Sequence, residues 1–406
     1  MKQVLLFLFV IASLNTALAQ SYSTKQITKD VKTLSSDKME GRETGTVGEE
    51  MAAAYISKQM GKIGLTPYGV GGFYQEFTFT PKAHPHAKEA SGKAITGKNV
   101  IGFLNNKAEQ TIVIGAHYDH LGMGSEGSLH SGDPEVHNGA DDNASGIAAM
   151  LYVAKKLKGN SDLSKYNYLF IAFSGEEKGL WGSKSYVRNP TLTLSKVNCM
   201  INMDMVGRLD SNKLAVNGVG TSSLWRGILK EANTQNLNLV LGEPGIGPSD
   251  HTSFYLEGIP VIHLFTGQHV DYHKPSDDFE KVNIQGVAQV GEFVYSISEQ
   301  LNKNEKLDYK KTKSDKSTKA PKFKVTLGVM PDYMFQGEGM RIDGVIPDRP
   351  AENAGILKGD VVVKMGEVEI KDMQSYMKGL SQFEPGDKTE VIIIRNGEKK
   401  KIDVTF

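Results

Sequence analysis

The stretch TIVIGAHYDH, residues 111–120, joins an apolar run to a polar end. Its first six residues are β-branched or small, which is typical of a strand buried on both faces. Such a strand delivers His117 at its carboxyl end. Asp119 shares the same side of an extended chain and is placed to accept the second ring N–H of His117. Because a lone histidine at a strand end is more often a surface residue, the interpretation depends on the rest of the chain.

Similar apolar runs alternate with helical patterns between Thr28 and Leu301. Strands are expected at residues 168–173, 197–203, 213–217, 239–241 and 260–265, and helices at residues 49–60, 145–157, 222–234 and 283–299. This alternation predicts an α/β fold with a mixed, mostly parallel sheet flanked by helices on both faces. In such sheets, ligands bind at the carboxyl ends of the strands.

Two acidic pairs follow expected strands. In NGADDNASG, residues 138–146, Asp141 and Asp142 lie in a glycine-flanked turn before a helix. They could cap that helix, but two desolvated neighbouring carboxylates repel, and a bound cation explains them better. In SGEEKGLWGS, residues 174–183, Glu176 and Glu177 are expected at the start of a helix, where one can bind a cation while the other takes a proton from a bound water.

Two further segments complete the set. Asp204 ends the apolar strand at residues 197–203, and His273 lies in the loop DYHKPSDD after the strand at residues 260–265. Three ligand carboxylates and one base bring together about four negative charges, which two divalent cations would neutralise. Histidine and carboxylate ligands without a thiolate favour two Zn²⁺ ions, with Co²⁺ or Mn²⁺ as alternatives.

Taken in this order, the five segments resemble the zinc aminopeptidase and carboxypeptidase family M28 over about Lys38 to Leu301, including MEGRETGT at residues 39–46. The resemblance implies a zinc-exopeptidase fold in which one carboxylate bridges two zinc ions. The implied roles are Asp142 as the bridge, His117 and Asp204 on one zinc, Glu177 and His273 on the other, Glu176 as general base, Asp119 behind His117, and Tyr272 as donor to the oxyanion.

The resemblance implies a di-zinc aminopeptidase that acts on peptides with a free N-terminus, through a metal-bound hydroxide and a glutamate base. Two alternatives stay open: a glutaminyl-cyclase-like enzyme with a single zinc, and a non-catalytic peptide-binding or receptor protein on the same scaffold. The full ligand set with Glu176 favours the peptidase. His251, in PSDHTSF, competes with His273 as a ligand, but in the family that segment lines the substrate pocket.

Three further histidines, His120, His130 and His137, fall in a glycine-rich loop. They are expected to be ordinary surface residues of a mobile flap rather than ligands of a third metal. The sole cysteine, Cys199, lies in the apolar run VNCMINMD and is expected to be a buried core thiol.

The ends of the chain predict export and a second domain. Lys2, an apolar run from Val4 to Leu14 and then Ala17 and Ala19 form the pattern of a signal peptide over residues 1–19. That run is shorter than the ~20 apolar residues that span a bilayer, so no membrane span is expected and the localisation is periplasmic or secreted. The M28-type domain is assigned residues 20–301 and a charged, solvated linker residues 302–322.

Residues 323–406 resemble a PDZ domain, with TLGV at residues 326–329 as the carboxylate-binding loop. Such a domain binds a peptide C-terminus, or alternatively packs on the catalytic domain. The length of 406 residues suits two domains. The formal net charge of +0 gives no reason to expect nucleic acid as a partner.

Overall fold

The computed structural model describes residues 24–80, 92–124, 127–312, 324–332, 335, 337–345 and 349–406. The predicted signal peptide and residues 313–322 of the predicted linker lie outside these ranges. The described residues form two compact units: the first holds 24–79, 94–266 and 273–312, and the second holds 80, 92–93, 267–272 and those from 324 onward. Within these ranges, no helix combines the length and apolarity that crossing a membrane requires.

The first unit is built on a mixed sheet with the order β1-β3-β5-β4-β6-β9-β7-β8, to which β2 adds by pairing with β3. Its strands are β1 Thr66–Pro67, β2 Tyr74–Phe79, β3 Ile95–Leu104, β4 Thr111–His117, β5 Asn167–Phe173, β6 Val197–Met203, β7 Lys213–Asn217, β8 Asn238–Leu241 and β9 Val261–Phe265.

The four central strands, β5, β4, β6 and β9, are parallel to one another. Antiparallel pairing is found towards the edges, where β3 pairs with β5 and β7 pairs with β9. The predicted mixed sheet is therefore confirmed, with its parallel part at the centre. Because parallel strands run in one direction, the carboxyl ends of these four strands lie along one edge of the sheet.

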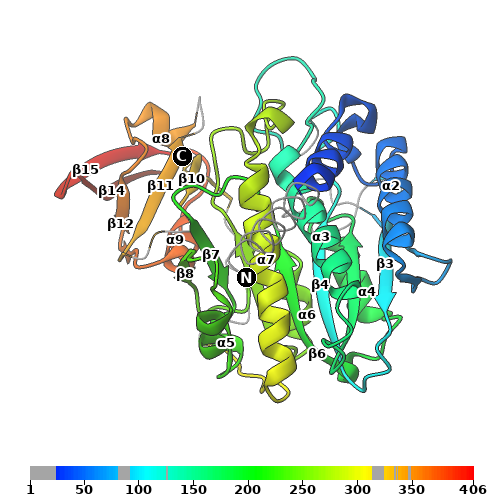
Figure 1. The fold of residues 1–406 in the computed structure, drawn as a ribbon. Helices are drawn as coiled ribbons and strands as arrows, with labels where there is room; N and C mark the ends of the chain where they lie inside the picture. Colours follow the sequence, from blue (N-terminus) through cyan, green and yellow to red (C-terminus); the bar gives the residue numbers. More distant parts are fainter. Residues whose placement is uncertain are drawn as a thin grey trace, which may run out of the picture. The chain divides into compact units, whose positions relative to one another are not determined.

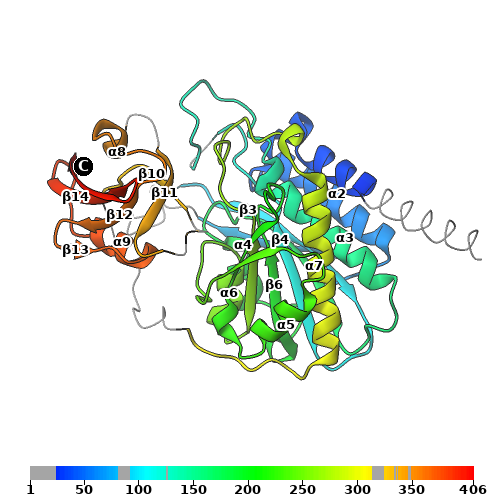
Figure 2. The same cartoon turned by 60° about the vertical axis from the view of Figure 1, so that its left-hand side comes forward.

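Helices cover both faces of this sheet (Figure 1 and Figure 2). The main ones are α2 Val47–Ile63, α3 Gly146–Lys158, α4 Trp181–Arg188, α5 Trp225–Ala232, α6 His251–Leu256 and α7 Ile284–Lys303. In β4, Ile112 and Ile114 pack in the core beneath α2, α3, α5 and α7, while Val113 packs in the core beneath α4 and α6. A strand with a core on each face needs apolar residues at every position, which explains the continuous runs in the sequence.

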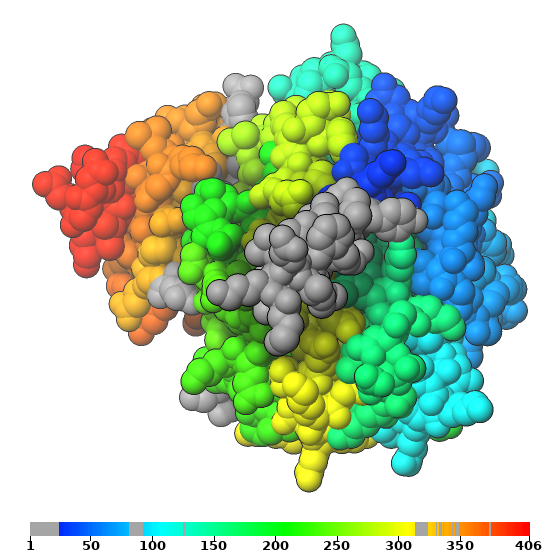
Figure 3. Space-filling view, in the orientation of Figure 1, coloured from blue at the N-terminus to red at the C-terminus, as the bar shows by residue number. Residues whose placement is uncertain are grey.

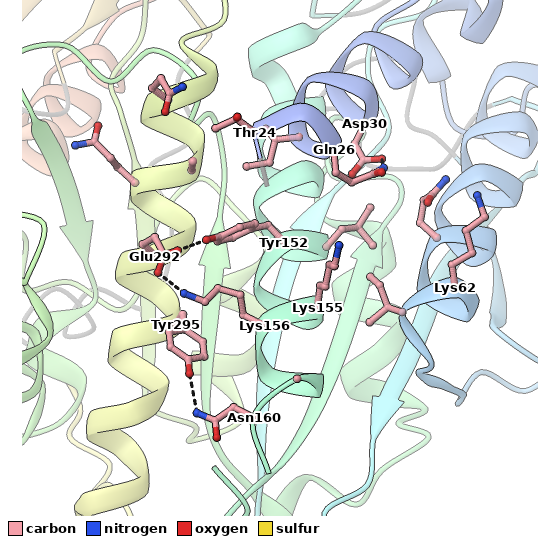
Figure 4. A pocket seen from close by; sticks show the side chains of 18 of the residues that line it. Thr24, Gln26, Asp30, Lys62, Tyr152, Lys155, Lys156, Asn160, Glu292 and Tyr295 are labelled. Atoms are coloured by element: carbon pink, nitrogen blue, oxygen red, sulfur yellow. Dashed lines mark hydrogen bonds and ion pairs between the residues drawn. The ribbon is translucent and has the colours of Figure 1, made fainter. Parts of the chain in front are cut away.

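Figure 3 shows the surface of the helical layer that contains α2, α3 and α7, with α2 in blue and α7 in yellow. A groove on this layer is lined by residues of α2, α3 and α7 and by residues 24–30 (Figure 4). Across it, Glu292 accepts hydrogen bonds from Tyr152 and Lys156, and Asn160 donates to the Tyr295 hydroxyl over 2.8 Å. None of the residues that line this groove is a predicted site residue.

Part of the predicted linker belongs to the first unit. Leu307 is buried, and its N–H donates to the side chain of Asn198 over 2.9 Å. The N–H of Thr312 lies 2.9 Å from the Tyr255 hydroxyl. Leu307 and Thr312 are therefore buried, whereas residues 305, 306 and 308–311 are exposed to solvent, and the linker assignment stays a prediction.

The second unit is β-rich, as predicted. Its sheet has the order β10-β11-β12-β14-β15, and β13 pairs with β12. Its elements are β10 Val329–Pro331, β11 Met340–Val345, α8 Pro350–Asn353, β12 Val361–Met365, β13 Val368–Glu369, α9 Met373–Leu380, β14 Lys388–Arg395 and β15 Glu398–Thr405. Leu327, Ile342, Val362, Met365 and Ile393 are among the buried residues of its own core.

Candidate metal centre

The carboxyl edge of the parallel strands brings the predicted acidic and histidine residues together. His117 is the last residue of β4, and Asp204 follows the last residue of β6 directly. Glu177 lies in the turn after β5, His273 in the loop after β9, and Asp142 in the turn that leads into α3. Five residues from distant parts of the sequence therefore meet at one place.

Asp142 lies at the centre of this arrangement, with a different histidine at each of its oxygens. Nε2 of His117 lies 3.2 Å from Oδ1 of Asp142 and 3.1 Å from Oδ1 of Asp204. Nε2 of His273 lies 3.3 Å from Oδ2 of Asp142 and 3.2 Å from Oε2 of Glu177. The five side chains thus divide into two groups of three that share Asp142.

These spacings fit metal ligands. A tetrahedral zinc ion with bonds of about 2.0–2.1 Å keeps its ligand atoms about 3.3–3.4 Å apart. The four distances given above approach that value, whereas charge-assisted hydrogen bonds are usually about 2.7–2.9 Å long. The donor types, imidazole nitrogen and carboxylate oxygen, also suit zinc. The residues present therefore fit two cations that share Asp142.

The charges of the cluster depend on the two histidines. Burial lowers the pKa of His117, but Asp204 and Glu176 outweigh it, so the pKa lies well above its ordinary value. Burial also lowers the pKa of His273, but Glu177 and Asp142 outweigh this effect and raise the pKa well above its ordinary value. In the metal-free chain, two protonated imidazoles would therefore offset part of the negative charge of the carboxylates, and bound cations would replace these protons.

Backbone carbonyls aim both imidazoles at the carboxylates. Nδ1 of His117 lies 3.2 Å from the backbone oxygen of Asp119 and 3.7 Å from Oδ1 of that residue, so the carbonyl is closer than the expected carboxylate. Nδ1 of His273 lies 2.8 Å from the carbonyl oxygen of Gly127. The carboxylate of Asp119 instead accepts from the N–H of Glu176 over 3.2 Å and from the Thr44 hydroxyl over 3.0 Å.

Glu176 and Glu177 lie in a turn rather than at a helix start, because α4 begins only at Trp181. Gly175 and Gly179 have φ values of 72° and 106°, which a right-handed helix cannot include. Removal from water raises the pKa of Glu176 well above its ordinary value, and the nearby Asp204 and Glu177 raise it further.

Comparison with known proteins agrees with this geometry. Residues 99–298 match the family model described as peptidase family M28, and residues 306–406 match that of the PDZ domain. The chain carries an M28 peptidase domain. The PDZ match begins at residue 306, within the stretch predicted to be a linker.

Curated relatives share the M28 domain over about half of this chain. Aminopeptidase YwaD of Bacillus subtilis is 32% identical over 230 residues, which cover 52% of this chain and 46% of the relative. The alkaline phosphatase isozyme conversion protein of Escherichia coli is 29% identical over 198 residues, 47% of this chain and 54% of the relative. The chain therefore spans about half the length of each.

Solved structures resemble the fold of the M28 domain. The zinc aminopeptidase BSAP from Bacillus subtilis gives a TM-score of 0.56 at 20% identity, covering 70% of this chain and 97% of that one. A glutaminyl cyclase from Porphyromonas gingivalis gives 0.56 at 19% identity, covering 68% of this chain and 98% of that one. At such identities the likeness shows the fold alone.

A buried arginine supports the M28 site. Arg42, in the MEGRETGT segment, donates to the carbonyl oxygens of Tyr118 over 2.7 Å, Leu34 over 2.6 Å, Asn138 over 2.7 Å and Gly139 over 2.9 Å. It therefore ties the exit of β4 to the turn before Asp142. Burial lowers the pKa of Arg42 to about 10. Reasoning from the sequence assigned no role to this residue, although its place in that segment was a signal.

His120 and His137 are fully buried, so the expectation that they are surface residues is wrong. His130 is partly exposed. The loop is held against the MEGRETGT segment, where the N–H of Gly122 donates to the Gly41 carbonyl over 3.1 Å. His137 contacts the Ser128 hydroxyl over 2.8 Å. Nδ1 of His120 lies 2.8 Å from Oε1 of Glu177, a contact that sequence reasoning missed.

The remaining predicted residues are His251, the alternative ligand, and Tyr272, the expected donor to the oxyanion. His251 begins α6 and is buried, with its ring stacked on His263 at a centroid distance of 4.6 Å. Among the described residues, the groups that could hold a metal ion are His117, Asp142 and Asp204, and His120, Asp142 and Glu177, so His251 belongs to neither. The backbone N–H of Tyr272 donates to the carbonyl of His269 over 3.0 Å.

Proposed function

We propose that the M28 domain is a di-zinc aminopeptidase that removes N-terminal residues from peptides. The observation that carries the proposal is the division of the two Asp142 oxygens between two histidine–carboxylate groups. A structural ion pair has no need for two imidazoles facing opposite oxygens of one carboxylate. Two cations that share one carboxylate would bind one oxygen each, and the histidine beside each oxygen would supply a further ligand to each cation.

His117, Asp142 and Asp204 would hold one zinc ion, and Asp142, Glu177 and His273 the other. When bound, the ions would lower the pKa of a coordinated water and polarise a carbonyl group. Co²⁺ or Mn²⁺ would suit the same donors.

Glu176 is the proposed general base. Its raised pKa suits a carboxylate that takes a proton from the attacking water and returns it to the leaving amine. Asp119 fixes the position of Glu176 by accepting its backbone N–H. Tyr272 is proposed to donate a hydrogen bond to the oxyanion of the tetrahedral intermediate.

The proposed substrates are peptides with a free N-terminus. Several relatives of this chain are named aminopeptidases, including leucine aminopeptidase 2 of Trichophyton rubrum, which is 29% identical over 195 residues. The bound metal ions would help to hold the free amine of such a substrate.

The C-terminal unit is proposed to be a peptide-binding PDZ domain within residues 323–406. Strand β10 lies at one end of the described sheet order and begins at Val329, the last residue of the TLGV segment. An edge strand can pair with an added peptide strand, and the backbone N–H groups of such a loop can hold a C-terminal carboxylate. Residues 1–19 are proposed to be a signal peptide that directs export to the periplasm or the medium, and residues 20–301 to be the catalytic domain.

Turnover of an unblocked substrate tests the proposal. Zinc-loaded protein should release nitroaniline from aminoacyl-nitroanilides but not from their N-acetylated forms. Loss of ammonia from peptides with N-terminal glutamine, with a single zinc per chain, would indicate a glutaminyl cyclase instead. Binding of peptides without any turnover would indicate a non-catalytic protein.

A further inference from the structure

The carboxylate of Glu177 has two histidine neighbours, one at each oxygen. Oε2 lies 3.2 Å from Nε2 of His273, and Oε1 lies 2.8 Å from Nδ1 of His120. The second contact comes from the loop after β4, three residues beyond His117. The segment HYDH therefore delivers one histidine to each side of Asp142.

The two contacts of Glu177 differ in kind. The 3.2 Å separation from His273 approaches the spacing of two ligands on one zinc ion, about 3.3 Å. The 2.8 Å separation from His120 is that of a charge-assisted hydrogen bond. Nδ1 of His120 also lies 3.9 Å from Oδ2 of Asp142, farther than the 3.3 Å between that oxygen and Nε2 of His273. A donor role thus fits His120 better than a ligand role.

The surroundings fix the His120 ring. The residue is fully buried. Its backbone N–H donates to the Arg42 carbonyl over 3.3 Å. At Gly139, an added Cβ would lie 2.5 Å from Cδ2 of His120, so the chain passes directly against the ring. These contacts hold the ring in one orientation, with Nδ1 directed at Oε1 of Glu177. A variant without a donor at this position would leave Oε1 without this hydrogen bond.

We propose that His120 is a positioning residue for the second zinc ion. Its Nδ1–H holds Oε1 of Glu177, which leaves Oε2 directed at the position shared with His273 and Asp142. Removing this donor weakens the second zinc site and leaves the first one, formed with His117 and Asp204, intact. The inference rests on the proposed two-metal function and adds to it the residue that sets the affinity of one of the two sites.

Two substitutions separate a donor from a ligand. His120→Asn keeps an N–H at the δ position, whereas His120→Leu has a similar volume and no donor. His130→Asn is a matched control, because His130 lies in the same loop but is partly exposed, and Glu135 is its ion-pair partner at 3.5 Å. The unfolding of each metal-free full-length chain shows whether the variant folds.

Competitive titration of each metal-free chain with Zn²⁺ measures the affinity for each of the two ions. The absorbance of Co²⁺ follows the filling of the same two sites. In His120→Leu, we expect the Zn²⁺ ion at the site of Glu177 and His273 to bind about 10- to 100-fold more weakly. The ion at the other site of that variant, and both ions in His120→Asn and His130→Asn, should bind with affinities near those of the wild type.

Three results would overturn the inference. Wild-type affinity for both equivalents in His120→Leu would show that the contact is dispensable. Equal losses in His120→Asn and His120→Leu would identify His120 as a direct ligand, and loss of both equivalents in His120→Leu would show a general structural role. If the wild-type chain binds fewer than two ions, the proposed function itself fails, and this inference fails with it.

Discussion

Nε2 of His273 lies 3.3 Å from Oδ2 of Asp142, whereas Nε2 of His117 lies near the other oxygen, Oδ1. His273 follows β9, whereas Asp142 precedes α3. The parallel arrangement of β4, β6 and β9 brings these distant residues to one edge of the sheet. The central claim, that two cations share one carboxylate, depends on this relationship.

The first prediction concerns the proposed base. Glu176→Gln keeps the size of the side chain but cannot accept a proton, so kcat should fall about 10²- to 10⁴-fold while two zinc ions remain bound. Steady-state kinetics with metal analysis measure both effects. Glu243→Gln, which changes an exposed residue paired with Arg226, is the control and should behave as wild type. Retained turnover in Glu176→Gln would remove this residue from the mechanism.

Zinc binding should release protons. The raised pKa values of His117 and His273 keep both imidazoles protonated at neutral pH in the metal-free chain, and an imidazole must lose that proton before it can bind a metal ion. Affinity should therefore rise with pH, by about tenfold per unit for each site. Calorimetric titrations in buffers of different ionisation enthalpy count the protons. An enthalpy that does not depend on the buffer would contradict the assignment.

Replacing Arg42 by methionine should destabilise the chain by about 2 to 5 kcal/mol, because four carbonyl groups lose the hydrogen bond that Arg42 donates. Urea unfolding measures the loss. Arg226→Met removes an exposed arginine and should change the free energy of unfolding by less than about 0.5 kcal/mol. Similar values for the two variants would show that the Arg42 contacts matter little.

The stacked histidines predict sensitivity to acid. Burial lowers the pKa of His263 to about 4, so between pH 6.5 and 4 the unfolded chain takes up a proton that the folded chain does not. This contribution to stability is fully present above pH 6.5 and falls by up to about 1.4 kcal/mol per unit as the pH drops.

Unfolding of the metal-free chain and of His263→Gln at several pH values tests this dependence. The difference in stability between the two chains should shrink as the pH falls from 6.5 to 4. Parallel curves would contradict the prediction, and His130→Asn should follow the wild type.

Much of the parallel core was predictable from local patterns. The strand expected at residues 197–203 coincides with β6, in which every residue is buried, because mainly apolar runs occur where both faces of a strand are covered. The end of α2 was less predictable. This helix passes Gly61 and stops at Gly64, whose φ of 91° ends it.

The site was only partly predictable. The residues at strand ends could be read from motifs, since parallel strands bring their carboxyl ends together. The roles of Arg42 and His120 could not. Arg42 bonds to carbonyls up to 97 residues away, and His120 contacts a glutamate 57 residues away. Such contacts depend on how the loops pack, and neither periodicity nor composition records that packing.

The most direct test of the shared carboxylate is the zinc content of the purified full-length chain, measured by mass spectrometry after dialysis against trace zinc. We predict two zinc ions per wild-type chain and fewer than one in Asp142→Asn, because that substitution weakens both sites at once. One ion or none in the wild type, or two ions retained in Asp142→Asn, would contradict the account.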